Sequence, residues 1–277
     1  MTQQPSHADD LASGARFRFG ENWARFLSVL DEPRIADAER SLATRLRRQR
    51  LDGLRFVDVG SGSGLFSLAA RRLGADVTSF DFDPSSVACT AEVRRRYFPD
   101  DPGWRVEEGS ALDRDFIKSL GSFDVVYSWG VLHHTGAMWE ALNLVTNLVG
   151  PGGQLFVALY NDQGHVSDAW RMVKRLYCAS PFGKAAVLGA FLPYFAGRGL
   201  VSDVVRRRNP LDRWRTMRLE RGMSFLHDIV DWLGGYPFEV ANPGELHEFF
   251  RSRQFVLEMM ETVGGTLGNN EFVFRRT

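Results

Sequence analysis

The fold of this chain is decided by the stretch FVDVGSGSGLFSLAA, residues 56–70. A short apolar run leads into three glycines spaced by two, Gly60, Gly62 and Gly64, and then into a run rich in alanine and leucine. This pattern predicts a strand, a tight glycine-rich turn and the start of a helix. Because glycine has no Cβ, such a turn lets a ligand approach the bare backbone. We therefore interpret the turn as the seat of a cofactor.

Strand and helix patterns alternate along the chain around this turn. Helices and short loops separate five predicted strands, which span residues 55–59, 76–81, 104–107, 123–129 and 154–160. Ser85 is a suitable N-cap for the helix after the second strand. The glycine-rich segment 150–153 is expected to close the helix before the fifth strand. This alternation predicts a doubly wound, mostly parallel sheet of the α/β class.

The last part of the chain predicts a different arrangement. After a helix over 243–253, two β-rich segments, 255–262 and 271–275, are joined by a connection rich in Gly and Asn, which predicts an antiparallel hairpin. We therefore expect a Rossmann-like, mostly parallel seven-stranded sheet that ends in this C-terminal hairpin and carries a helical cap insertion. The expected segments are an N-terminal helical flap at 1–52, a cofactor-binding core at 53–160, the cap on the substrate side at 161–243, and a C-terminal helix and hairpin at 244–277.

Composition excludes several classes of protein. The chain has 277 residues, 44% of them hydrophobic, and a formal net charge of zero, so bulk charge names no partner. Cys89 and Cys178 form no disulfide framework, and a reducing, cytoplasmic setting is expected. Residues 1–10 lack the apolar segment of a signal peptide, and no stretch reaches the ~20 apolar residues that span a bilayer. The six histidines show no metal-ligand spacing, so no metal site is expected.

The residues around the glycine turn narrow the choice of cofactor. A phosphate-binding loop needs Lys and then Ser or Thr after its last glycine, whereas Leu65 and Phe66 follow Gly64. A dinucleotide site has its third glycine at the position that Leu65 occupies. Asp81 ends the second strand about 20 residues further on, where a carboxylate can accept hydrogen bonds from both ribose hydroxyls of a nucleotide cofactor.

Four segments in order identify a family. VDVGSGSG, residues 57–64, resembles motif I of the class I S-adenosylmethionine-dependent methyltransferases, and FDFD (80–83), GSALD (109–113) and FDVVYSW (123–129) resemble their motifs II, III and IV. The resemblance covers roughly 53–160 and 244–277. It implies a bacterial methyltransferase of the small-molecule type, with S-adenosylmethionine as the cofactor and an in-line displacement at its sulfonium methyl.

The resemblance also implies where the cofactor lies. The backbone of residues 60–64 would face its methionyl and ribose parts, Asp81 would hold the ribose diol, and Phe82 would line one face of the adenine. Ser110 stands where many members of the family carry Asp, so the main chain of Ala111 would meet the adenine edge instead. The expected cofactor contacts are Asp58, Gly60, Ser61, Gly62, Gly64, Asp81, Phe82, Ser110, Ala111, Ser128, Trp129 and Trp23.

Several of these contacts have a second interpretation. Asp58 either reaches the cofactor or hydrogen-bonds the turn. Asp83, before Pro84, fits simple turn chemistry. Trp129 is either a wall of the site or a specific contact near the methionine end. Trp23 either belongs to a lid over the cofactor or packs on the edge of the core.

Candidates for chemistry on the acceptor follow the fourth and fifth strands, where ligands bind in open α/β sheets. A base is needed only if the acceptor must lose a proton, as an alcohol or phenol often must. His133, which follows the fourth strand, is the favoured base, and Tyr160 and Asp162 follow the fifth. The alternative is that His133 and His134 only pack at the start of a helix.

The cap carries the information about the substrate. Residues 171–221 are strongly basic, with the densest run at 206–218, which fits an anionic small-molecule substrate, a nucleic acid, a membrane surface or a solvated helix face. The run 185–196 is apolar but too short to span a bilayer, and fits a buried helix, a homodimer contact or a peripheral membrane segment.

We expect methyl transfer to an O or N atom of a small or medium organic acceptor. RNA methylation is a second interpretation, against which no RNA-binding motif is evident. A third is a protein that binds the cofactor without catalysis.

Overall fold

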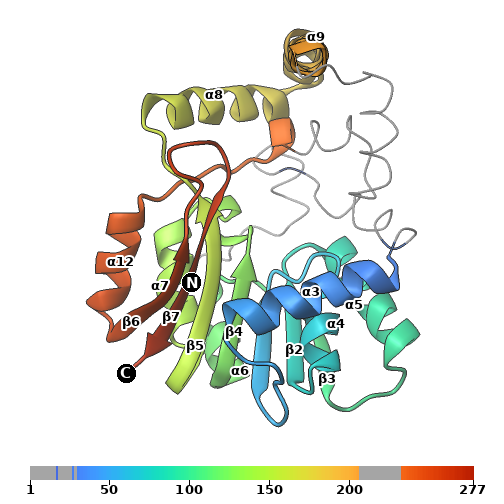
Figure 1. Cartoon of the computed structure of the whole chain (residues 1–277), viewed down its shortest axis with the longest axis vertical. Helices are drawn as coiled ribbons and strands as arrows, with labels where there is room; N and C mark the ends of the chain where they lie inside the picture. Colours follow the sequence, from blue (N-terminus) through green and yellow to red (C-terminus); the bar gives the residue numbers. More distant parts are fainter. Residues whose placement is uncertain (1–16, 18–26, 28–29, 206–231) are drawn as a thin grey trace. The chain divides into compact units, whose positions relative to one another are not determined.

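The structure is a computed structural model, and it describes Phe17, Leu27 and residues 30–205 and 232–277 (Figure 1). These residues fall into two compact units. Unit 1 holds the described residues between 27 and 167 and those from 238 to 277. Unit 2 holds Phe17 and the described residues between 168 and 237. The predicted site residues that the structure describes all belong to unit 1.

Unit 1 is built on one seven-stranded sheet with the strand order β3-β2-β1-β4-β5-β7-β6 (Figure 1). The neighbours from β3 to β5 pair in parallel, while β7 is antiparallel to both β5 and β6. This confirms the predicted fold class, including the C-terminal hairpin. The strands are β1 (Arg55–Val59), β2 (Asp76–Asp81), β3 (Trp104–Glu108), β4 (Phe123–Trp129), β5 (Val149–Tyr160), β6 (Phe255–Glu261) and β7 (Asn269–Arg276).

Helices cover both faces of this sheet, and so its strands are apolar on both sides. Alternate side chains of a strand point to opposite faces, and two separate clusters of buried residues result. One cluster joins Phe56 and Tyr127 to α3 (Glu32–Arg45), α4 (Leu65–Arg72) and α5 (Pro84–Tyr97). The other joins Val57 and Val126 to α6 (Arg114–Leu120), α7 (Met138–Thr146) and α12 (Pro243–Arg251).

The prediction that Ser85 caps α5 is wrong. Asp83 is the N-cap, and its carboxylate accepts the N–H of Ser85 at 2.9 Å. Pro84 then occupies the first helical position, where its missing N–H costs nothing. The turn chemistry suspected at Asp83 is therefore the cap of this helix.

The predicted start of the fifth strand is also wrong. β5 begins at Val149, so the glycine-rich segment 150–153 lies inside the strand. The register against β4 shifts between Phe123 and Val125, which accommodates the extra residues as an irregularity of the pairing.

Unit 2 is helical in its described part. It contains α8 (His165–Ala179) from residue 168 on, and α9 (Pro181–Val205). Tyr177, Val187 and Leu233 form its buried cluster. The basic run predicted at 206–218 lies outside the described residues. Among the helices that the structure describes, none is long and apolar enough to cross a membrane.

Candidate cofactor and acceptor site

The glycine turn between β1 and α4 has left-handed backbone at all three glycines. The φ angle is +78° at Gly60, +54° at Gly62 and +77° at Gly64, values that glycine adopts most readily because it has no Cβ. The N–H groups of Gly60 and Ser61 donate to the carbonyl of Phe80, at 2.9 and 3.0 Å. The turn is thereby tied to the end of β2.

Close packing is a further reason for glycine in this turn. A Cβ at Gly60 would lie 2.3 Å from Cγ1 of Val131, and one at Gly64 would lie 2.9 Å from Cα of Thr90. Thr90, on α5, is missing from the predicted site residues, and its hydroxyl hydrogen-bonds the hydroxyl of Ser61 at 2.9 Å. Ser61 is buried by this contact and offers a ligand only its backbone. A threonine inside the predicted helix after the second strand is the sequence signal for the contact.

Asp81 joins the end of β2 to the glycine turn. Its carboxylate accepts the N–H of Gly62 through Oδ2 and that of Asp83 through Oδ1, both at 2.9 Å. Partial burial raises the pKa of Asp81 to about 6, although the hydrogen bonds from Asp83 and Gly62 act to lower it. A carboxylate has about four lone-pair sites, and backbone N–H groups do not use all of them, so Asp81 keeps acceptor capacity for a ligand hydroxyl. The residues present therefore fit a ribose diol.

Asp58 is directed into the protein, and its side chain hydrogen-bonds α4 rather than the glycine turn. It is buried and accepts a hydrogen bond from the hydroxyl of Ser67 on α4 at 2.6 Å. Ser67 accepts from Ser79 at 2.7 Å, and Ser79 from the indole of Trp104 at 2.8 Å. Burial, and to a lesser degree the charge of Asp81, raise the pKa of Asp58 to about 7. Ser67 and Ser79 are missing from the prediction, and their signal is a small polar residue inside an apolar run.

The predicted adenine side lies next to Asp81. The N–H of Gly109 donates to the backbone carbonyl of Asp81 at 3.0 Å. The hydroxyl of Ser110 accepts the N–H of Leu112 at 3.1 Å, which shapes the loop after β3. The side chain of Ala111 is buried in the core, so Ala111 has only its backbone to offer. Phe82, the residue directly after β2, is half-buried.

The two residues predicted near the methionine end point to opposite faces of the sheet. Ser128 is buried, and its hydroxyl donates to the carbonyl of Val59 at 3.1 Å, which joins the ends of β4 and β1. Trp129 is 42% exposed, and its indole N–H donates to Glu271 at 2.9 Å. Trp129 is therefore held toward β7. This contact favours the interpretation that Trp129 lines the site over that of a specific contact with the cofactor. Trp23, the predicted lid residue, lies outside the described residues.

His133 lies in the 3₁₀ helix η1 (Leu132–His134) and is fully buried. Its Nδ1 accepts the backbone N–H of Tyr160 at 3.2 Å. A nitrogen that accepts a hydrogen bond carries no proton, so Nδ1 is the unprotonated nitrogen of this ring. A general base needs an unprotonated nitrogen directed at the acceptor, and that of His133 faces main chain. These contacts favour the packing alternative over the prediction of His133 as the base.

Tyr160 is at the centre of a group of rings at the end of β5. Its ring centroid is 3.9 Å from that of His133, 5.5 Å from that of His134 and 5.1 Å from that of Phe238. Asp162 does not join this group, because it is exposed and its carboxylate accepts the N–H of Gly164 at 2.8 Å. The structure thus brings together His133 and Tyr160 but leaves Asp162 outside.

Residues 238–241 run beside the end of β5. The N–H of Ala241 donates to the carbonyl of Tyr160 at 3.0 Å. The N–H of Glu239 donates to the carbonyl of His133 at 2.9 Å, and its carboxylate accepts the N–H of Met138, the first residue of α7, at 3.0 Å. Glu239 therefore satisfies a helix terminus that has no cap of its own. We name this arrangement the neck: residues 160–162 and 238–241.

A second buried contact at the neck is missing from the prediction. The side-chain amide of Asn270 donates to that of Asn161 at 2.9 Å and accepts the N–H of Val263 at 3.0 Å. Asn161 in turn donates to the carbonyl of Thr266 at 3.2 Å. The two amides hold the hairpin connection against the end of β5. The Gly/Asn-rich sequence there predicts only a turn, not this pair.

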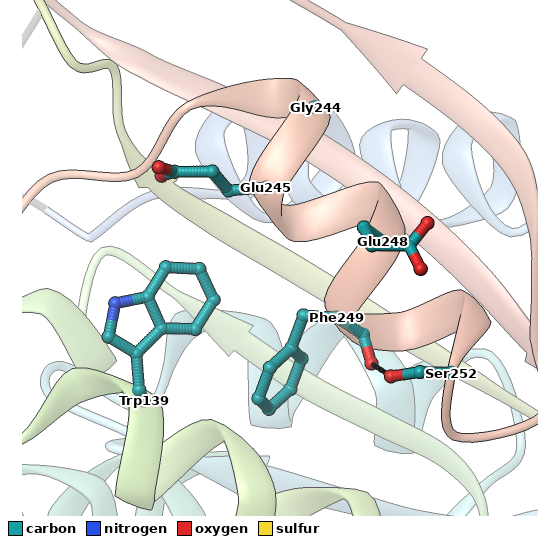
Figure 2. Close-up of a pocket in the computed structure, with 6 residues that line it drawn as sticks. All are labelled: Trp139, Gly244, Glu245, Glu248, Phe249 and Ser252. Atoms are coloured by element: carbon teal, nitrogen blue, oxygen red, sulfur yellow. Dashed lines mark hydrogen bonds between the residues drawn. The ribbon is translucent and has the colours of Figure 1, made fainter.

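A surface hollow lies away from these residues. It has a volume of about 630 Å³ and lies between α7 and α12 (Figure 2). Trp139 faces Phe249 across it, with ring centroids 5.2 Å apart. None of the predicted site residues lines it. The predicted cofactor residues that the structure describes lie at the carboxyl ends of β1, β2, β3 and β4, and not at this hollow.

Comparison with known proteins identifies the family. The family described as "Methyltransferase domain" matches residues 30–241. An "Ubiquinone biosynthesis O-methyltransferase" of Sinorhizobium medicae (strain WSM419) is 32% identical over 114 residues, 41% of this chain and 44% of the relative. One of the same name from Caulobacter sp. (strain K31) is 32% identical over 177 residues, 58% of this chain and 69% of the relative.

The chain matches about half the length of the first of these curated relatives. Among solved structures, magnesium protoporphyrin IX methyltransferase from Synechocystis PCC 6803, with bound SAH, has a TM-score of 0.52 and 12% identity, covering 100% of this chain and 90% of that one. This likeness supports the fold. The family match extends over most of the chain, and it confirms the resemblance seen in the motifs: the chain belongs to the methyltransferase domain family, within the class I S-adenosylmethionine-dependent methyltransferases.

Proposed function

We propose that this protein transfers the methyl group of S-adenosylmethionine to an oxygen of a small organic acceptor. The observation that carries the cofactor half of the proposal is the pairing of Asp81 with the N–H of Gly62. It puts a carboxylate with spare acceptor capacity beside a turn of bare backbone. Oxygen is proposed as the methylated atom because the curated relatives at 32% identity are named O-methyltransferases.

In this proposal the chain binds and orients. Asp81 accepts the ribose hydroxyls, the backbone of Gly60 to Gly64 faces the ribose and methionyl parts, and the backbone of Ala111 meets the adenine edge. When bound, the cofactor supplies a methyl group already activated on a sulfonium. Since displacement at that methyl is in line, correct placement of the acceptor supplies much of the acceleration. The new C–O bond forms as the C–S bond breaks, and the proton of a phenolic acceptor passes to water.

On the acceptor side we assign the contact to Tyr160 and the positioning to His133. The Tyr160 ring lies at the end of β5 and is half-buried, while His133 stacks on it and accepts its backbone N–H. Replacing His133 by Asn keeps a polar group but removes the ring that supports Tyr160. We expect this change to raise KM for the acceptor more than it lowers kcat at saturating acceptor.

The proposal is tested by supplying methyl-labelled S-adenosylmethionine with a panel of phenols and catechols and a matched panel of amines. We expect the label in an ether linkage with at least one oxygen acceptor, and at least about tenfold less transfer by the Asp81→Asn variant at limiting cofactor. Label recovered only on nitrogen or carbon would contradict the oxygen assignment. Equal transfer by Asp81→Asn would contradict the assigned cofactor site.

A further inference from the structure

Unit 2 exposes large apolar side chains on both of its described helices. On α8, Met172 and Leu176 are 68% and 50% exposed, and at the start of α9 Phe182 is 87% exposed. Met172 and Leu176 are four residues apart and therefore share one side of the helix. Lys174 and Tyr177, which are buried, lie on the other side. α8 thus exposes two large apolar side chains to solvent on the side away from its buried residues.

α9 repeats this arrangement. Val187 is buried, whereas Ala186, Gly189 and Pro193 are exposed on the side away from it, with Phe182 one turn before them. None of these exposed residues is charged. A helix of a monomeric globular protein normally carries polar residues on its solvent side. Figure 1 shows α9 end-on beside the C-terminal part of α8.

The charged residues of the same segment are almost all basic. No Asp or Glu occurs between residues 169 and 202. Arg171, Arg175 and Lys184 are exposed beside the apolar residues, and Arg171 is bridged to Asp168 at 2.7 Å. The exposed apolar side chains are therefore bordered by positive charge.

We propose that this part of unit 2 docks on an anionic lipid bilayer, with α8 and α9 lying in the plane of its surface. We name the surface the α8–α9 surface: Met172, Leu176, Phe182, Ala186 and Pro193, with their basic border. An interfacial helix inserts apolar side chains at the boundary of headgroups and acyl chains while Lys and Arg meet the lipid phosphates. Long basic side chains reach those phosphates while their stems cover apolar surface.

Charge decides between a bilayer and a second copy of this chain. A two-fold contact through the same surface would bring Arg171, Arg175 and Lys184 of one copy near the equivalent residues of the other. Like charges brought together at an interface disfavour that partner. An anionic headgroup layer neutralises the same residues. The proposal stands on the described residues of unit 2 and does not rest on the proposed methyl transfer.

The test is flotation of the full chain with vesicles of phosphatidylcholine alone and of phosphatidylcholine with one quarter phosphatidylglycerol. We expect binding to the anionic vesicles at least tenfold tighter than to the neutral ones. Arg175→Gln should weaken it by about fivefold, because one basic residue near an anionic surface contributes on that order. Met172→Glu should weaken binding at least tenfold, since it puts a negative charge at the centre of the apolar contact with a negatively charged bilayer.

Met260→Glu is the matched control. Met260 is 51% exposed on β6 of unit 1, so it tests whether any new surface charge reduces binding; we expect no change. Circular dichroism checks that all variants are folded. The proposal is overturned if wild type floats with neither vesicle, or if Met172→Glu and Met260→Glu lose binding equally. A dimer in light scattering that dissociates on Met172→Glu, without flotation, would identify a second copy as the occupant instead.

Discussion

Asp81 is the residue on which the candidate cofactor site depends most. It ends β2, accepts two backbone N–H groups and is partly exposed. Asp58, the other carboxylate near the turn, is buried against Ser67. The two carboxylates therefore have different roles: Asp58 supports α4 from inside, and Asp81 keeps acceptor capacity on the side of the turn.

The raised pKa of Asp81, about 6 and caused chiefly by burial, predicts a pH dependence of cofactor binding. Ribose hydroxyls donate to the ionised carboxylate, so cofactor binding lowers the pKa of Asp81. The affinity for the cofactor is therefore highest above pH 6, where the carboxylate is ionised. Below pH 6 the dissociation constant should rise by up to about tenfold per pH unit. Calorimetry with S-adenosylmethionine between pH 5 and 8 measures this.

Asp81→Asn is the control for that titration. Its amide nitrogen cannot accept a hydrogen bond, so binding should weaken by at least about tenfold, and the dependence near pH 6 should disappear. A wild-type affinity that stays constant between pH 5 and 7 would show that Asp81 does not hold the ribose.

The turn glycines give a prediction about stability. Gly64→Ala adds a Cβ 2.9 Å from Cα of Thr90 at a φ of +77°, so it combines backbone strain with overpacking. We expect a loss of about 2–4 kcal/mol in the free energy of unfolding. Gly152→Ala is the matched control, because φ is +70° there and nothing lies within 4 Å of the added Cβ. It should lose about 1–2 kcal/mol. Equal losses in urea unfolding would refute the packing argument.

At the scale of elements, the neck connects distant parts of unit 1. Glu239 contacts both η1 and the first residue of α7, and Asn161 pairs with Asn270 of β7. These contacts place Tyr160 between His133 and Phe238. The end of β5 is thus contacted by side chains from three separate segments: η1, residue 238 and β7.

Lys174 of α8 gives a prediction for unit 2. It is fully buried, and its ammonium group donates to the carbonyl of Trp232. Burial lowers its pKa to about 7, although Cys178 acts to raise it. Between pH 7 and about 10.5 the unfolded chain therefore binds a proton that the folded protein does not, so stability rises with pH over this range.

We expect this rise to be about 1 kcal/mol per pH unit just above pH 7 and to be absent in Lys174→Met. Urea unfolding of the full chain at pH 7 and 8.5, followed by tryptophan fluorescence, measures the slope. The slope is the quantity to compare, because the substitution also removes the hydrogen bond to Trp232. The same slope in both proteins would mean that Lys174 stays protonated when buried.

At the scale of the whole molecule, the sheet of unit 1 could be predicted because its signals are local. Each strand of the core is a short apolar run, and the glycines of the turn stand directly between a strand and a helix. The bounds of β5 could not be predicted, because the pairing with β4 extends the strand through a glycine-rich segment. Asp83 takes the cap from Ser85 because Pro84 fits the first helical position.

Some site residues could likewise be predicted from local sequence, and others could not. Asp81 is predictable because its position relative to the glycines is set by one strand–helix–strand unit. The orientations of Asp58, Ser128 and His133 depend on partners that are distant in sequence or contributed by main chain: Ser67, the carbonyl of Val59 and the N–H of Tyr160. No spacing rule contains those contacts, so the sequence alone leaves their roles open.

The location of the cofactor is tested most directly by hydrogen–deuterium exchange with and without S-adenosylhomocysteine. We expect slower exchange in peptides covering the glycine turn, residues 81–83 and 109–112, and the end of β4, with no change in peptides that line the hollow between Trp139 and Phe249. Protection confined to that hollow, or to peptides of unit 2, would contradict the placement of the cofactor at Asp81 and the glycine turn.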